Sequence, residues 1–188
     1  MENNHIDIKN KLDEGLSFKI SRFKEQIKKT RPHKHDEYNE FIFLSEGEGF
    51  HCIESEKFVV STPEFYFLKP GQLHFWQFTS IPKGFVIIFK DTEFNVVNEN
   101  LLIDLLRKLS DITRLEIQSD KYPTHILEDI FSEFQLNTQY SKEIIHGLLK
   151  ALLGKLLQIR AEKPTNSNQP QPVDRKSTRL NSSHRIRS

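Results

Sequence analysis

The chain has 188 residues, of which 27 are basic and 26 acidic, so its formal net charge at pH 7 is +1. Residues 164–188 hold five basic residues and one acidic residue, a net charge of +4, which leaves −3 for residues 1–163. A body of that charge lacks the clustered basic surface typical of duplex binding. No apolar run approaches the ~20 residues that cross a bilayer, the polar N-terminus lacks the apolar segment of a secretory signal, and a single cysteine excludes an internal disulfide. We therefore expect a cytoplasmic protein with no membrane partner.

Phenylalanine divides the body into two parts. Thirteen of the fifteen phenylalanines lie between Phe18 and Phe94, where Gly and Pro separate short apolar runs. Aromatic residues favour the half-buried surface of a sheet, and such punctuation is typical of turns between strands. Seven closely spaced strands indicate a sandwich or barrel rather than a parallel sheet with crossover helices. The predicted strands are Leu16–Phe23, Tyr38–Leu44, Gly49–Glu54, Phe58–Ser61, Glu64–Leu68, His74–Phe78 and Gly84–Lys90.

After Phe94 the apolar residues recur at helical spacing. This period predicts a helix over Glu99–Ser110 and a second helix with Thr124 as its N-cap, after Pro123. Between them, Ile112–Gln118 fits a short strand. The fold class that follows is mainly β with two to three C-terminal helices.

The last predicted helix, Ser141–Arg160, has an apolar stripe wider than one buried face requires. One interpretation is burial between the sheet and another helix of the same chain. The interpretation that we favour places one edge of the helix on its own sheet and the other on a second copy of the chain. The homodimer contacts that it predicts are Ile145, Leu148, Leu149, Leu152 and Leu156.

The two ends of the chain differ from the body. We expect residues 1–15 to be a flexible N-terminus, 16–95 a barrel, 96–163 a helical dimerisation segment and 164–174 a solvated linker. The tail, residues 175–188, is basic enough for a nucleic-acid arm. The interpretation that we favour is a translated sequencing adapter, which is not native sequence and implies a shortened gene model.

Polar side chains with metal-ligating chemistry gather in the segment from His33 to Glu40. His33 and His35, at positions i and i+2 of an extended segment, point to the same face, and Glu40 joins them if the strand twists or bulges. His74 opens a later predicted strand after the Pro70-Gly71 turn. Three imidazoles and one carboxylate suit Fe, Mn, Ni, Cu or Zn. The same four residues also fit a polar effector pocket, or simple hydrogen bonding at a barrel mouth.

Strand alternation predicts which neighbours share the interior with these residues. If Glu40 faces inward, so do Ile42 and Leu44, while Phe41 and Phe43 face outward beneath the helices. If His74 faces inward, so do Trp76 and Phe78, with Trp76 either packed in the core or stacked on a ligand. His51 faces either the pocket or solvent. The candidate ligand-binding residues are His33, His35, Glu40, Ile42, His51, His74, Trp76 and Phe78. Four other histidines have no partner at ligand spacing and receive no role: His5, His125, His146 and His184.

Residues 33–47 match a His-x-His, four residues, Glu, six residues, Gly pattern, and Pro70, Gly71 and His74 match part of a second motif. These motifs resemble the cupin signature, although the leading glycine is Ile27 here and the later asparagine is Phe78. The resemblance implies a small antiparallel β-barrel of the jelly-roll type. It implies His33, His35, Glu40 and His74 as the ligands of a divalent transition metal, if one is bound.

A resemblance to a second family covers about residues 16–160. The segments RPHKHDEYNEFIFLSEGEGFHCIE, FYFLKPGQLHFWQF and GFVIIF, followed by paired helices, resemble the N-terminal sensing and dimerisation domain of AraC-type transcriptional regulators. That resemblance implies a small-molecule effector such as a sugar or an aromatic acid, a homodimer, no catalysis and no cofactor. It places DNA binding in a C-terminal domain of two helix-turn-helix units that this sequence lacks. The alternative is a single-domain, metal-dependent cupin enzyme.

Overall fold

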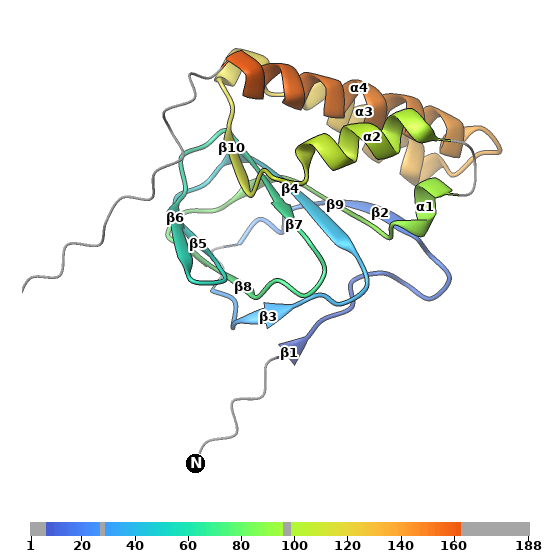
Figure 1. Cartoon of the computed structure of the whole chain (residues 1–188). Helices are drawn as coiled ribbons and strands as arrows, with labels where there is room; N and C mark the ends of the chain where they lie inside the picture. Colours follow the sequence, from blue (N-terminus) through green and yellow to red (C-terminus); the bar gives the residue numbers. More distant parts are fainter. Residues whose placement is uncertain (1–6, 27–28, 96–98, 163–188) are drawn as a thin grey trace, which may run out of the picture.

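The chain folds into three layers: two sheets that face each other, and a layer of helices on the outer side of one sheet (Figure 1). The computed structural model describes residues 7–26, 29–95 and 99–162. A predicted linker and tail beyond residue 163 lie outside the described residues. The prediction of a mainly β fold with C-terminal helices is confirmed.

Each sheet has five strands. Neighbouring strands are antiparallel except Asp7–Ile8 and His33–Lys34, which are parallel. The first sheet runs in the order β1 (Asp7–Ile8), β3 (His33–Lys34), β8 (His74–Phe78), β5 (Gly49–Ile53) and β6 (Glu56–Val59). The second sheet runs in the order β10 (Arg114–Glu116), β7 (Glu64–Leu68), β4 (Asn39–Glu46), β9 (Lys83–Phe89) and β2 (Phe18–Arg22). Among the described residues, no strand pairing joins the two sheets.

The helices come after β9 along the chain, with β10 between the second and third of them, and they lie together on one side of the molecule (Figure 1). They are α1 (Thr92–Asn95), α2 (Asn100–Leu109), the 3-10 turn η1 (Ser119–Lys121), α3 (Thr124–Leu136) and α4 (Ser141–Glu162). No helix in the described part of the chain is both long and apolar enough to span a bilayer. One detail of the prediction is wrong: Thr124 is the first helical residue of α3, and Pro123, which has no side chain able to cap, occupies the N-cap position.

Strand β4 separates the two cores of the molecule. Ile42 and Leu44 belong to a cluster between the sheets, whereas Phe41 and Phe43 belong to a larger cluster beneath the helices. This is the alternation that the sequence predicts, because successive side chains of a strand point to opposite faces. The two faces of one strand therefore line two different layers.

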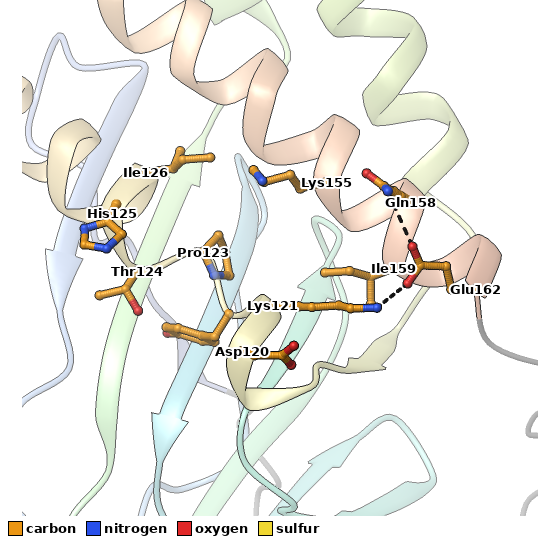
Figure 2. A pocket seen from close by; sticks show the side chains of 11 residues that line it. Asp120, Lys121, Pro123, Thr124, His125, Ile126, Lys155, Gln158, Ile159 and Glu162 are labelled. Atoms are coloured by element: carbon orange, nitrogen blue, oxygen red, sulfur yellow. Dashed lines mark hydrogen bonds and ion pairs between the residues drawn. The ribbon is translucent and has the colours of Figure 1, made fainter.

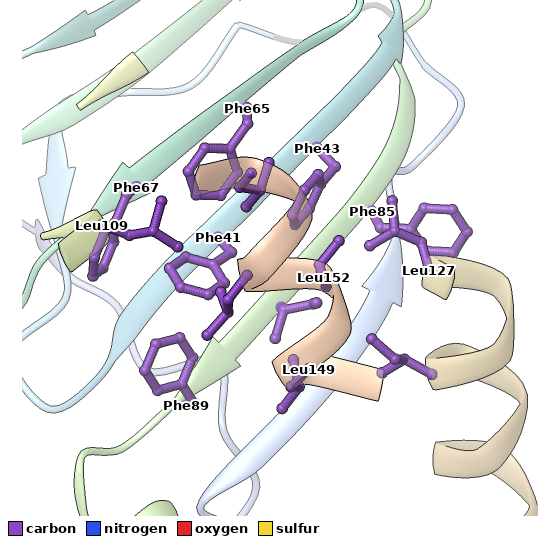
Figure 3. Close-up of a cluster of buried hydrophobic side chains, with 14 of the residues drawn as sticks. Phe41, Phe43, Phe65, Phe67, Phe85, Phe89, Leu109, Leu127, Leu149 and Leu152 are labelled. Carbon is purple, nitrogen blue, oxygen red and sulfur yellow. The ribbon is translucent and has the colours of Figure 1, made fainter. Parts of the chain in front are cut away.

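The larger cluster fills the space between the second sheet and α4 (Figure 3). Phenylalanines from β4, β7 and β9 meet leucines of α4, and α4 also contacts α2 and α3. Four of the five predicted dimerisation residues are buried in this core: Ile145, Leu149, Leu152 and Leu156. The fifth, Leu148, is partly buried there. These residues therefore have packing partners within the chain itself, and the homodimer interface stays a prediction. The wide apolar stripe arises because α4 is enclosed by a sheet and two helices.

Part of the N-terminus that we expected to be flexible is built into the fold. β1 pairs with β3 in parallel, Lys9 N donates a 2.9 Å hydrogen bond to Lys34 O, and Leu12 is buried. The sequence gives no sign of this, since the segment is polar and its partners lie more than twenty residues away.

The core position of α4 predicts the effect of shortening one of its leucines. Leu152 is 0% exposed, so Leu152→Ala leaves a cavity and should lower the free energy of unfolding by about 2–5 kcal/mol. Leu101→Ala, at a side chain that is 60% exposed on α2, is the matched control and should change it by less than about 0.5 kcal/mol. Urea unfolding of the full chain measures both. Equal losses in the two variants would contradict this packing.

Candidate functional site

Four polar side chains, three from residues 33–40 and one from residue 74, converge between the two sheets. The first sheet supplies His33 and His74, which are paired directly across β3 and β8, and His35 follows immediately after β3. The second sheet supplies Glu40 from β4. Each of the four is at most 3% exposed. One ring nitrogen from each of the three histidines lies within 4.8 Å of the others, and Glu40 Oε2 lies 3.3 Å from His35 Nε2 and 3.8 Å from His74 Nε2.

Backbone carbonyls fix the proton positions of two of these rings. His33 Nδ1 lies 2.9 Å from Arg31 O, and His35 Nδ1 lies 2.9 Å from Lys9 O. A carbonyl oxygen only accepts, so each Nδ1 must carry the proton and donate it. In a neutral ring this leaves a lone pair on Nε2. His33 and His35 thereby have the tautomer that binds a metal ion through Nε2.

Burial favours neutral imidazoles in this cluster. It lowers the pKa of His33 to about 4 and that of His74 to about 3, because the charged rings would lose their hydration. Both rings are therefore neutral at pH 7, which is the form that coordinates a metal.

The carboxylate of Glu40 is the one formal negative charge of the cluster. Burial alone would raise the pKa of Glu40, but the positive charge of the nearby Lys11 ammonium holds it well below its usual range. Lys11 forms an ion pair with Oε1. The other oxygen, Oε2, is buried and has no hydrogen-bond partner among the described residues. An orphaned buried carboxylate oxygen beside an imidazole lone pair favours a cation between them.

A row of aromatic rings begins at His74 and runs from the cluster into the space between the sheets. His51 Nε2 and His74 Nδ1 share a 3.0 Å hydrogen bond, and the His51 ring stacks on Trp76 at 3.5 Å with an interplanar angle of 10°. Trp76 also stacks on Phe78. Of the two orientations left open for His51, the structure has the inward one, with the side chain 0% exposed.

Apolar side chains pack next to these rings between the two sheets. Three predicted pocket residues, Ile42, Trp76 and Phe78, pack in one cluster with Leu44, Ile53, Val60, Tyr66 and Leu68. A groove of about 440 Å³ lies elsewhere, between η1, the start of α3 and the end of α4 (Figure 2). Its lining includes the Lys121–Glu162 ion pair and none of the predicted ligand-binding residues.

Two residues of the site were missed by sequence reasoning. Tyr38 OH lies 2.8 Å from His35 Nδ1, and Lys11 pairs with Glu40. Tyr38 lies three residues after His35, inside the His-x-His motif of residues 33–47, so its position in the sequence could have indicated that it belongs to the site. Lys11 is 29 residues from Glu40 and carries no such signal.

The donor set fits a divalent transition metal, with His33, His35, His74 and Glu40 as the residues that would hold it. Such an ion would supply a Lewis acid at the end of the space between the sheets.

No family model and no curated protein matches the sequence. The solved structures that are similar to the chain include AraC-family regulators and cupin proteins. A structure of ToxT from Vibrio cholerae has a TM-score of 0.49 and 13% identity, over 76% of this chain and 57% of that one. The AraC-like transcriptional activator CuxR has a TM-score of 0.35 and 11% identity, over 63% and 43% of the two chains.

Among the cupin proteins, a predicted oxalate decarboxylase from Thermotoga maritima has a TM-score of 0.33 and 16% identity, over 39% of this chain and 64% of that one. In all three comparisons the match spans less than two thirds of the other protein.

The lowered histidine pKa values predict the pH dependence of stability. The unfolded chain takes up a proton at His74 near pH 6.5, whereas the folded chain does so only near pH 3, so stability is present above pH 6.5 and falls as the pH falls toward 3. Between pH 7 and pH 5 we expect His74 to account for a loss of about 2 kcal/mol. Urea unfolding in EDTA at the two pH values measures the loss. His74→Gln should reduce it by that amount, and an unchanged pH dependence in the variant would show that His74 is not held neutral.

Proposed function

We propose that this chain is the effector-sensing domain of a transcriptional regulator of AraC type, in which occupancy of the His33, His35, Glu40 and His74 cluster alters the helical layer. The observation that carries the proposal is the double role of β4. Glu40 projects from one face of this strand into the cluster, and Phe41 and Phe43 project from the other face into the core beneath α4. A shift of β4 that accompanies binding therefore reaches α4 through direct packing contacts.

A polar connection runs parallel to this packing. Asn39, which precedes Glu40, donates a 2.8 Å hydrogen bond to Asp91 Oδ1 just before α1. Glu93 of α1 is buried, and its Oε1 lies 3.1 Å from His146 Nε2 on α4. His146, which received no role from the sequence, therefore attaches α4 to the strand layer. The two routes join the cluster to the same helix.

The resemblance to AraC-type regulators adds four properties to the proposal: an effector, a homodimer, a DNA-binding domain and a location in the cytoplasm. A small polar effector such as a sugar or an aromatic acid would bind at the cluster, near the buried Trp76 and Phe78. The domain would form a homodimer, DNA would be bound by a further helix-turn-helix domain, and the protein would act in the cytoplasm. Because Ile145, Leu149, Leu152 and Leu156 are buried in this chain's own core, pairing would use other side chains.

A second candidate is a metal-dependent enzyme of the cupin type. The convergence of three imidazoles on one point favours it. Binding followed by turnover of the bound compound would favour the enzyme, whereas binding that changes only the helical layer favours the sensor.

A ligand screen with a structural readout tests the sensor. Aldose sugars and aromatic carboxylates are each added to the full chain, and a compound that raises Tm in the wild type but not in a His33→Ala, His35→Ala double variant identifies an effector. With that compound bound, hydrogen exchange should change in residues 141–150 of α4. Asn39→Ala should leave the Tm shift in place and weaken the change in α4. Site-dependent binding that leaves exchange throughout α4 unaltered would contradict the proposal.

A further inference from the structure

His51 lies behind the cluster and not in it. Its Nε2 lies 3.0 Å from His74 Nδ1, and it is not one of the three histidines whose ring nitrogens converge. We propose that His51 is a positioning residue: it accepts a hydrogen bond from His74 Nδ1 and so keeps the lone pair of His74 Nε2 turned toward a divalent transition metal ion. This inference rests on the proposed binding site but not on its signalling role.

The contacts around His74 determine where its proton lies when no cation is bound. His35 Nε2 carries no proton in the neutral ring, since Nδ1 of that ring donates to Lys9 O. The 3.1 Å contact between His35 Nε2 and His74 Nε2 then requires His74 to donate from Nε2. His74 Nδ1 is left as an acceptor, and His51 must donate to it from Nε2.

Coordination through His74 Nε2 requires the opposite arrangement. The proton of His74 must then reside on Nδ1, where it is donated to His51 Nε2, and the proton of His51 must reside on Nδ1. The proton that His51 Nε2 donates passes to His74 Nδ1, the proton displaced from His74 Nε2 is released to water, and His51 Nδ1 takes one proton from water. Each ring ends with one N–H, so the pair neither gains nor loses a proton overall. The two rings change tautomer together because they share one hydrogen bond.

The surroundings of His51 permit this change. Its Nδ1 is buried and has no hydrogen-bond partner among the described residues, so placing a proton there breaks no existing contact. The ring is held flat against Trp76 and edge-on to Tyr66, at centroid distances of 3.5 and 4.7 Å. Stacking fixes the plane of His51 and therefore the direction of the hydrogen bond that it offers to His74.

Zinc affinity tests the inference, with Zn²⁺ alone as the probe and calorimetry of the full chain as the readout. His51→Phe keeps a flat ring against Trp76 but removes the acceptor, and should weaken Zn²⁺ binding by about 10- to 100-fold. His51→Gln restores an acceptor oxygen and should recover part of the affinity. His125→Phe makes the same exchange at an exposed histidine and should stay within about twofold of the wild type. Equal affinity in the wild type and His51→Phe would overturn the inference.

A spectroscopic readout in the wild type needs no variant. Nitrogen-15 NMR of the histidine rings should place the protons of His51 and His74 on Nε2 without Zn²⁺ and on Nδ1 with it. If Zn²⁺ binds and neither ring changes tautomer, the inference about His51 is wrong, but the assignment of the metal site to His33, His35, His74 and Glu40 still holds. A wild type that binds no Zn²⁺ would overturn the metal assignment as well. The sensor proposal fails on a different result, a bound effector that leaves α4 unchanged.

Discussion

A buried carboxylate governs the arrangement of this protein. Glu40 is 1% exposed, and a charge so far from water is tolerated only when other groups compensate it. Lys11 supplies one positive charge from the N-terminal segment, and the imidazoles of His35 and His74 lie beside the other oxygen. Meeting this requirement brings together strands from both sheets and a segment that looked flexible. The site is therefore a consequence of how one charge is accommodated.

The same strand links that charge to the helices. Since β4 presents Glu40 and Ile42 on one face and Phe41 and Phe43 on the other, its position is set jointly by the polar cluster and by the core under α4. The hydrogen bond from Asn39 to Asp91 and the Glu93–His146 contact add a second attachment of α4 to the strands. A domain built in this way suits a sensor, because a change at the cluster has two short routes to one helix.

Local patterns predicted the features of the site that depend on a single segment. The i, i+2 spacing of His33 and His35 and the alternation along β4 follow from strand geometry, so the inward-facing set was predictable. The Lys11–Glu40 pair, the hydrogen bond from His51 to His74 and the burial of Leu149 and Leu152 depend on segments that meet only in the folded chain. An amphipathic stripe shows that a helix is buried, but it does not distinguish a partner in the same chain from one in another copy.

The coupling between the cluster and α4 is the central claim, and a double-mutant cycle tests it without any ligand. The free energy of unfolding is measured for the wild type, Glu40→Gln, His146→Ala and the double variant, whose two sites share no direct contact in the described structure. We expect the two effects to be non-additive by more than about 0.5 kcal/mol, because β4 and α1 connect the sites. Additive effects would contradict the claim that the cluster and the helical layer respond to each other.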